Sequence, residues 1–306
     1  MVSIGVPVYN DAKFLREALD SLLAQDYSNF ELIISDNASQ DATQEISREY
    51  AARDPRVSYH RNATNLGATE NFNQAFRLST GKYFMWAGGH DVWAPTYLSR
   101  CVQVLESDEA IVQCNSLAQN MSQDGKTIFE TLRQFDTRGK GLLVRANLVL
   151  WQVSAFIAYS VIRSAALRQT RLLIQVGGPD LLLGFELSLL GPFALVPEAL
   201  FFMRDHRGDR SRQPNRAQYF VDLQKRLNPA GSTYFGRFWR WAFTLEELRA
   251  VRRARLPFGQ RIAVTSCVFP AYFVWFYPRV PEAFRRLVRG SLNRWASQPH
   301  TGGELK

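Results

Sequence analysis

The sequence predicts an α/β fold of the Rossmann-like kind, with a mostly parallel sheet flanked by helices and a helical C-terminal extension that is basic and aromatic. Two observations support this prediction. Short apolar segments alternate with helix-length amphipathic segments through the first 116 residues, which is typical of βαβ units and a parallel sheet. Beyond residue 213 this alternation stops, and arginine and aromatic residues become frequent.

The first strand and helix set the pattern. Residues 2–10 form an apolar run that ends in a turn, which predicts a buried strand. In residues 11–25 the apolar side chains from Phe14 to Leu22 recur at helical spacing, and Asn10 or Asp11 is placed to cap the helix. By the same reasoning we predict strands at residues 30–39, 56–60, 82–89 and 110–116, and helices at residues 40–53, 67–81 and 94–107.

After residue 117 the alternation is weaker. Residues 123–127, QDGKT, are typical of the turn of a hairpin. Residues 177–206 begin with a glycine-rich turn, continue as an apolar helix and break at Gly191-Pro192, and we expect a strand at residues 193–203.

Composition excludes several protein classes. The three cysteines, Cys101, Cys114 and Cys267, form no C-x-x-C pair, which argues against a disulfide framework or a zinc knuckle and fits a reducing compartment. The first residues lack the basic flank and the small-residue cleavage site of a signal peptide. We therefore expect a cytoplasmic protein.

The positive charge lies in the last third of the chain. Residues 206–306 carry 19 Lys and Arg against 6 Asp and Glu, whereas residues 1–205 carry 18 against 22. The apolar segment 262–277 contains Pro270 and is shorter than the roughly 20 residues that cross a bilayer. Arginines flank it on both sides, which suits an anionic membrane surface better than nucleic acid. The alternative is a core helix with solvated arginines.

Polar residues follow three of the predicted strands. Asn10, Asp36 and Asp91 each come just past the end of an apolar run. In open parallel sheets the carboxyl ends of the strands meet at one edge, where ligands bind. Each residue alone is typical of a helix cap or a turn, but three at equivalent strand ends indicate a site.

The N-terminal residues resemble family 2 glycosyltransferases, which have the GT-A fold. The matching motifs are Pro7-Val8-Tyr9-Asn10, then Gln25-Asp26-Tyr27, then Glu31 through Asp36, Ser39 and Asp41, and finally Asn65, Gly67 and Asn73. The resemblance covers residues 2–116 well and residues 175–212 moderately. It implies a nucleotide-sugar pocket lined by Pro7, Tyr9, Asn10, Asn65 and Gly67.

The resemblance also implies how the nucleotide is bound. Tyr9 would lie near the base, and Asp36 would accept a hydrogen bond from a base N–H such as the imide of uracil. Core packing is the alternative for Tyr9. Members of the family commonly have two consecutive aspartates in the turn that here reads GGHDVW, so that His90 and Asp91 take their places. Asp91 would bind Mn²⁺ or Mg²⁺, and His90 would contact the ribose or join the metal ligands.

A general base is implied in the second half. The family places an aspartate after a glycine-rich loop at the start of an apolar helix, and Asp180 in GGPDLLLGFE holds that position. Such an aspartate is also a good helix cap. Glu186, within the same helix, is a weaker candidate. Arg204 and His206 match the family's R-x-H segment and would meet the diphosphate or close over the site; solvated surface charges are the alternative.

We expect three regions and one function. The resemblance implies that residues 1–116 bind the nucleotide sugar and residues 117–212 the acceptor, and the basic, aromatic composition of residues 213–306 predicts a helical extension at the membrane. The function would be inverting transfer of a sugar, from a UDP-sugar by preference, to a saccharide or lipid-linked acceptor at the inner membrane face, in cell-surface polysaccharide or glycolipid synthesis. The alternatives are an inactive GT-A binding module, a sugar nucleotidyltransferase and a nucleic-acid binder.

Overall fold

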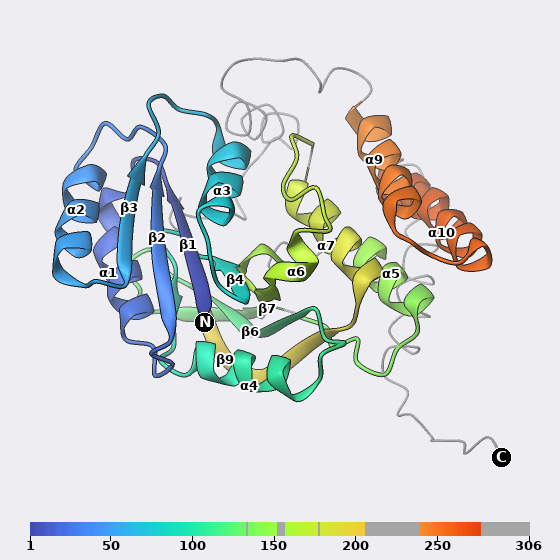
Figure 1. Cartoon of the computed structure of the whole chain (residues 1–306), viewed down its shortest axis with the longest axis horizontal. Helices are drawn as coiled ribbons and strands as arrows, with labels where there is room; N and C mark the ends of the chain where they lie inside the picture. Colours follow the sequence, from blue (N-terminus) through green and yellow to red (C-terminus); the bar gives the residue numbers. More distant parts are fainter. Residues whose placement is uncertain (133, 152–156, 177, 206–238, 277–306) are drawn as a thin grey trace.

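The computed structural model describes residues 1–132, 134–151, 157–176, 178–205 and 239–276. In these residues nine strands form a single sheet with helices on both sides (Figure 1). The strands are β1 (Val2–Val8), β2 (Phe30–Asp36), β3 (Val57–Arg61), β4 (Tyr83–Trp86), β5 (Val92–Trp93), β6 (Gln113–Met121), β7 (Ile128–Leu132), β8 (Val161–Arg163) and β9 (Phe193–Arg204). The helices are α1 (Ala12–Leu23), α2 (Thr43–Arg53), α3 (Ala68–Arg77), α4 (Tyr97–Ser107), α5 (Leu142–Trp151), α6 (Ser164–Leu167), α7 (Pro179–Leu190), α9 (Trp239–Arg253) and α10 (Phe258–Phe276), with a 3₁₀ turn η1 (Ile157–Tyr159).

The strand order is β3-β2-β1-β4-β8-β6-β9-β5, and β7 pairs with β6. The first four strands are parallel, as predicted, because each is joined to the next by a helix or loop that returns the chain across the sheet. Beyond β4 the sheet is mixed: β8 is antiparallel to both β4 and β6, whereas β6 and β9 are parallel. The α/β fold class is confirmed, and the parallel part is the N-terminal half.

Alternation along the strands divides the core into two layers. In β4, Tyr83 and Met85 belong to one cluster of buried residues, and Phe84 and Trp86 belong to another on the opposite face of the sheet. Buried residues of α1 and α4 complete the first cluster, and those of α3, α5 and α7 complete the second. Since side chains of a strand alternate between faces, the sheet is covered on both sides.

The predicted hairpin turn and the predicted strand after Gly191-Pro192 are both present. Residues 122–127 join β6 to β7, and β9 follows α7 directly. Strand β6 spans residues 113–121 and therefore crosses the expected division at residues 116 and 117. The division at residue 213 lies outside the described residues.

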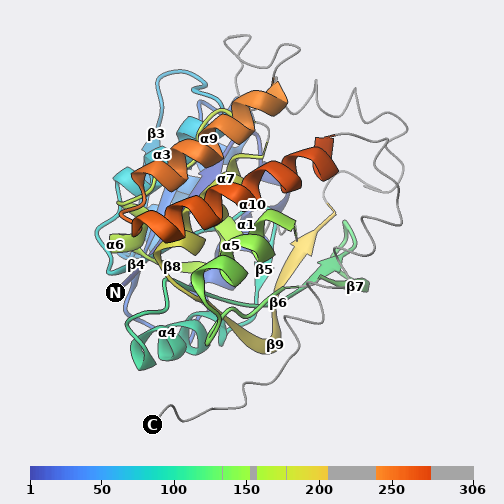
Figure 2. The same cartoon turned by 90° about the vertical axis from the view of Figure 1, so that its right-hand side faces the viewer.

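The apolar C-terminal segment begins as a helix of the core. Helices α9 and α10 lie beside each other and pack against α5 and α7 (Figure 2). Val264 and Val268 of α10 are fully buried in the second core cluster, whereas Phe258 and Ile262 are 76% and 51% exposed. None of the helices in the described part of the chain has the length and hydropathy of a membrane span. Residues 277–306 lie outside that part.

Candidate active site

Hydrogen bonds connect the loops that follow β1 and β2. Val8 is paired with Asp36 in the register of the two strands, so the chain leaves both at the same level. Asn10 has a φ of +54°, its main-chain N–H donates to Ser39 Oγ at 3.0 Å, and its Oδ1 accepts from the N–H of Gln40 at 2.8 Å. Asparagine tolerates this left-handed conformation better than most residues. Asn10 thus bridges two loops, while its neighbour Tyr9 is 44% exposed, with Pro7 buried behind it in β1.

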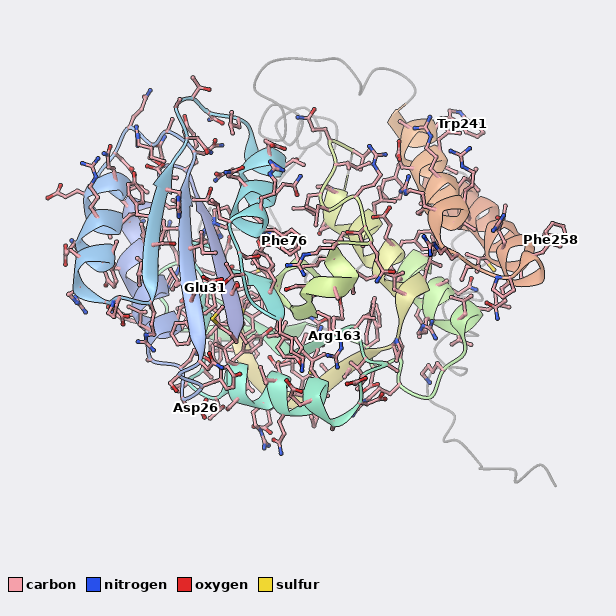
Figure 3. All side chains as sticks on the ribbon, in the orientation of Figure 1. Asp26, Glu31, Phe76, Arg163, Trp241 and Phe258 are labelled. Atoms are coloured by element: carbon pink, nitrogen blue, oxygen red, sulfur yellow. The ribbon has the colours of Figure 1, made fainter. Side chains whose placement is uncertain are left out.

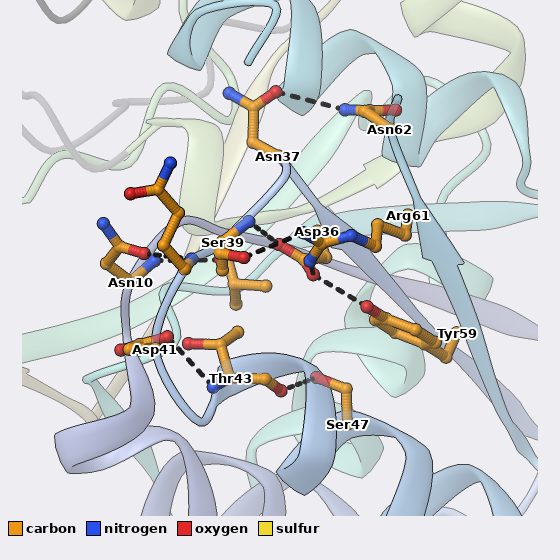
Figure 4. Close-up of polar contacts among 12 residues, drawn as sticks. Asn10, Asp36, Asn37, Ser39, Asp41, Thr43, Ser47, Tyr59, Arg61 and Asn62 are labelled. Carbon is orange, nitrogen blue, oxygen red and sulfur yellow. Dashed lines mark hydrogen bonds and ion pairs between the residues drawn. The ribbon is translucent and has the colours of Figure 1, made fainter. Parts of the chain in front are cut away.

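Asp36 is fully buried at the end of β2 and its carboxylate is surrounded by donors (Figure 4). Oδ1 accepts from the N–H of Ser39 at 2.8 Å, and Oδ2 accepts from Tyr59 Oη at 2.7 Å and from Arg61 Nη1 at 2.6 Å. Burial alone would raise the pKa of Asp36, but the hydrogen bonds from Ser39, Tyr59 and Arg61 outweigh it and lower that pKa. Asp36 is therefore an ionised carboxylate that holds the strand ends together.

A network of side-chain amides shapes the loop before α3. Asn37 Nδ2 donates to Asn65 Oδ1 at 2.8 Å, and Asn62 Nδ2 donates to Asn37 Oδ1 at 3.2 Å and to Asn71 Oδ1 at 2.9 Å. Asn65 Oδ1 also accepts from the N–H of Gly67 at 2.8 Å. These bonds satisfy buried amides and fix the loop. The two residues expected in the pocket, Asn65 and Gly67, are thereby held beside the end of β2.

The turn after β4 brings Asp91 beneath the end of β1. Asp91 is 1% exposed, its N–H donates to the carbonyl of Gly88 at 3.3 Å, and its Oδ1 accepts from the N–H of Arg204 at 2.9 Å. His90 lies between two carboxylates: Nδ1 is 3.7 Å from Asp11 Oδ1 and Nε2 is 3.9 Å from Asp91 Oδ1. The structure therefore brings His90 and Asp91 together with the loop that follows β1.

The chemistry of this turn fits a cation that is shared with a substrate. In the described residues, no three His, Cys, Asp or Glu side chains form a group that could hold a metal ion by themselves. Mg²⁺ sites in phosphate-binding proteins commonly use one or two carboxylates and complete the shell with phosphate oxygens and water. Asp91, with His90 beside it, offers that kind of incomplete donor set.

Arg204 lies next to this turn but is directed into the protein. It is 1% exposed, and its Nε donates to the carbonyl of His90 at 2.8 Å. We expected Arg204 to meet the diphosphate or close over the site; the contacts seen here are with protein groups. His206, from the same expected segment, lies outside the described residues.

Asp180 occupies the first turn of α7, as expected for the candidate base. Gly178 precedes the helix with a φ of +95°, which favours glycine, and Pro179 starts it. Loss of hydration raises the pKa of Asp180 to about 6, although hydrogen bonds from its own N–H and from Leu181 act in the opposite direction. A carboxylate with a pKa near neutrality is suited to accept a proton in a reaction.

Glu186, the second candidate, is engaged in the packing of α9. It is 6% exposed, its Oε2 accepts from the N–H of Arg171 at 2.9 Å, and its Oε1 forms an ion pair with Arg253. Removing one partner from such a buried pair is costly. The structure therefore gives Glu186 a role in joining α7 to α9.

Sequence reasoning missed Tyr59 and Arg61, the two β3 residues that bind Asp36. A signal was present, because residues two apart in a strand share one face. Arg61 is the register partner of Asp36. The sequence does not predict that β3 pairs with β2, so it could not show that Tyr59 and Arg61 lie next to the Asp36 side chain.

Comparisons with known proteins agree with this architecture. The family model of glycosyl transferase family 2 matches residues 3–163. An uncharacterized glycosyltransferase of Rickettsia prowazekii is 35% identical over 117 residues, which are 37% of this chain and 36% of that protein. An uncharacterized glycosyltransferase of Haemophilus influenzae is 25% identical over 245 residues, 77% of this chain and 74% of that protein. The chain thus matches only about a third of the Rickettsia protein but most of the Haemophilus one.

Solved structures share the fold at low sequence identity. Staphylococcus aureus TarS 1–349, solved in complex with UDP-GlcNAc, has a TM-score of 0.62 and 14% identity, covering 96% of this chain and 81% of that chain. The mannosyltransferase PcManGT from Pyrobaculum calidifontis, in complex with GDP-Man and Mn²⁺, has a TM-score of 0.52 and 17% identity, covering 97% and 88%. The fold is therefore GT-A. Since the family model covers more than half of its residues, the chain belongs to glycosyl transferase family 2.

Proposed function

We propose that this chain is an inverting glycosyltransferase that moves a sugar from a nucleoside-diphosphate sugar, UDP-linked by preference, to an acceptor hydroxyl. The observation that carries the proposal is the position of Asp91 at the carboxyl edge of the parallel strands. Its side chain is 1% exposed, and a hydrogen bond from the main-chain N–H of Arg204 orients the carboxylate. Ligands of open α/β sheets bind at that edge. TarS has been solved with UDP and with UDP-GlcNAc, which supports the preference for UDP.

The donor would lie along the ends of β1, β2 and β4. Tyr9, exposed beside Asn10, offers a ring to the base, and the amide network around the buried Asp36 carboxylate offers fixed polar groups. Asp91 and His90 would hold Mn²⁺ or Mg²⁺ against the diphosphate, and the use of a metal is supported by PcManGT, which was solved with GDP-Man and Mn²⁺. The metal would neutralise charge that develops on the leaving diphosphate.

Asp180 would act on the acceptor. The acceptor oxygen attacks the anomeric carbon from the face opposite the diphosphate, the bond from that carbon to the diphosphate oxygen breaks with its electron pair, and the acceptor proton passes to Asp180. One displacement inverts the anomeric configuration. The pKa of about 6 leaves Asp180 mostly ionised at neutral pH, as a base must be.

Two experiments test the proposal. Thermal unfolding should be measured with UDP-, GDP- and dTDP-sugars, with and without Mn²⁺, because a ligand that binds only the native state raises Tm. Asp91→Ala should keep the fold and lose the Mn²⁺-dependent part of the shift and all transfer, whereas His90→Asp should keep or raise metal affinity. An Asp91→Ala variant with unchanged transfer and an unchanged Mn²⁺-dependent Tm shift would exclude Asp91 as the metal ligand. If the unmodified protein binds the donor without hydrolysis or transfer, it is an inactive binding module.

The cellular role is proposed from the relatives. Escherichia coli K12 WcaA, named for colanic acid biosynthesis, is 38% identical over 99 residues, 32% of this chain and 36% of that protein. A role in cell-surface polysaccharide or glycolipid synthesis, with a saccharide or lipid-linked acceptor, is consistent with that relative.

We also propose that the α9–α10 pair contacts an anionic membrane at its cytoplasmic face. Trp241 and Leu245 of α9 and Phe258 and Ile262 of α10 are 43–76% exposed, and Figure 3 shows Trp241 and Phe258 at opposite ends of the pair. Exposed arginines of residues 252–261 accompany them. Apolar side chains flanked by arginines suit the interface of anionic lipids.

Vesicle flotation tests this second proposal. Phe258→Ser with Ile262→Ser should reduce binding to vesicles of anionic lipid, and neutral vesicles should bind less than anionic ones. Ile128→Ser in β7 is the control, since Ile128 is 45% exposed on a different element. If the unmodified protein stays unbound at low salt, the exposed residues serve another purpose.

A further inference from the structure

Arg204 is an arginine with almost no exposure to solvent. It is the last residue of β9, is paired in register with Met121 of β6, and is 1% exposed. Burying a guanidinium is costly unless its N–H groups find acceptors. The acceptors therefore show which parts of the molecule this residue holds together.

One set of contacts holds the turn that contains Asp91. The main-chain N–H of Arg204 donates to Asp91 Oδ1 at 2.9 Å, and its side-chain Nε donates to the carbonyl of His90 at 2.8 Å. A single residue thus fixes both the direction of the Asp91 carboxylate and the peptide that precedes it. Both contacts are short enough to be well-formed hydrogen bonds.

A second set of contacts reaches two other elements. Nη1 donates to the carbonyl of Gln123 in the β6–β7 turn at 2.8 Å, and Nη2 is 2.7 Å from Glu17 Oε2 of α1. The guanidinium also lies over the ring of Phe14, 4.8 Å from its centroid. The turn after β4, the β6–β7 turn and α1 therefore converge on one side chain.

We propose that Arg204 is a positioning residue that sets the orientation of Asp91 for metal binding. The proposal rests on the proposed function, in which Asp91 holds the metal. It assigns Arg204 to the support of the metal turn instead of direct contact with the diphosphate. Groups that orient a metal ligand commonly change metal affinity by about 10–100-fold when they are removed.

The geometry explains why arginine is needed. Two carbonyl acceptors and the Glu17 carboxylate lie in three directions around Arg204, and the planar guanidinium meets them as a rigid fork. The ammonium group of lysine has the same charge, but it is a point donor and cannot reach all three acceptors. Arg204→Lys therefore keeps the positive charge and the main-chain hydrogen bond to Asp91. It removes the simultaneous side-chain contacts with His90, Gln123 and Glu17.

Arg163 provides a matched control. It is another arginine that binds main-chain carbonyls, with Nε 2.7 Å from the carbonyl of Ile111 and Nη2 3.0 Å from that of Asp108. It pairs in register with Tyr83 at the start of β4, whereas Asp91 follows the end of that strand. Arg163→Lys should therefore lower stability without affecting the metal turn.

The test compares hydrogen exchange and binding in the two variants. In Arg204→Lys, amides of residues 88–93 and 122–127 should exchange faster than in the unmodified protein, and the Mn²⁺ concentration that supports UDP binding should rise about 10–100-fold. UDP binding without Mn²⁺ should change little. Arg163→Lys should show neither effect at a comparable loss of Tm.

The outcomes separate this inference from the proposed function. Exchange that is unchanged at residues 88–93 in Arg204→Lys would overturn the positioning role, whatever the enzyme transfers. Faster exchange together with unchanged Mn²⁺-dependent UDP binding would also overturn it, because the turn would move without affecting the metal. If the unmodified protein binds UDP identically with and without Mn²⁺, the metal role of Asp91 fails first, and the link from Arg204 to metal binding fails with it.

Discussion

The side chain of Asn73 pairs with the main chain of Leu173 in both directions. Its Nδ2 donates to the carbonyl of Leu173 at 2.7 Å, and its Oδ1 accepts from the N–H of Leu173 at 3.1 Å. Asn73 is buried in α3, which packs on β1, and Leu173 belongs to the segment that leads to Asp180. This two-point contact ties the segment before the candidate base to the N-terminal, parallel half of the sheet.

Replacing Asn73 tests whether this link matters for catalysis. Asn73→Ala leaves the buried N–H and carbonyl of Leu173 without their partner, which costs about 1–3 kcal/mol for such groups. We expect lower stability in urea unfolding and a lower kcat, with donor affinity unchanged. Asn29→Ala, at an exposed position, is the control. Equal kcat in both variants would show that the link serves stability alone.

Asp180→Asn tests the proton acceptor. The amide keeps the size of the side chain but cannot take a proton at neutral pH, so kcat should fall about 10²–10⁴-fold while the donor Kd stays within a few-fold. In the unmodified enzyme, kcat should rise with pH through about 6 and then level off, because only the ionised form of Asp180 is a base. A near-normal rate in the variant would place the base elsewhere.

The same substitution has a predicted effect on stability. The pKa of Asp180 is about 6 in the folded protein, above its ordinary value of 3.8. The unfolded chain therefore loses the proton first, and stability falls as pH rises from about 4 through 6. Asp180→Asn should raise the free energy of unfolding at pH 7 and leave it nearly unchanged at pH 3.5. Destabilisation at pH 7 would indicate instead that Asp180 is mainly a helix cap.

Gly88→Ala tests the close approach of Gly88 to Asp91, the proposed metal ligand. A Cβ on Gly88 would lie 2.6 Å from Asp91 Oδ2, so the added methyl group must push the carboxylate aside. We expect Mn²⁺-dependent UDP binding to weaken about tenfold or more, measured by titration calorimetry. Gly141→Ala is the control, because a Cβ there meets no described atom within 4 Å. Unchanged binding in Gly88→Ala would argue against Asp91 as a metal ligand.

Glu247 in α9 should make stability depend on pH. Burial raises the pKa of Glu247 to about 8 from the usual 4.5, so stability should fall as pH rises between these values. Glu247→Gln should remove this slope and raise the free energy of unfolding at pH 8 by about 1–4 kcal/mol, since one pKa unit is about 1.4 kcal/mol. Urea unfolding from pH 4 to pH 9 measures it.

The neighbouring Glu246→Gln gives the opposite expectation. Glu246 forms ion pairs with Arg171 and Arg249, each at 2.5 Å, and is equally buried. Losing these partners should destabilise the protein at pH 7. A gain in stability from Glu246→Gln, or a loss from Glu247→Gln at pH 8, would contradict this account of α9.

The local elements and the positions of the motif residues follow from patterns in the sequence. The alternation of apolar strands with amphipathic helices predicted the elements from β1 to α4 except the short β5, and the break at Gly191-Pro192 correctly separated α7 from β9. Asp180 was placed at the start of a helix, and Asn10, Asp36 and Asp91 were placed past strand ends. These features depend on residues close together in the chain, where periodicity and turn chemistry carry the information.

Which distant side chains meet depends on how the elements pack in the folded chain. The pairing of β3 with β2 brought Tyr59 and Arg61 onto Asp36, and β9 brought Arg204 onto the turn of Asp91. The mixed half of the sheet was likewise not predictable from local patterns, and the core packing of α10 through Val264 was one of two alternatives that the sequence left open. The physical reason is that strand order, register and burial come from contacts between residues far apart in the sequence, which no local propensity encodes.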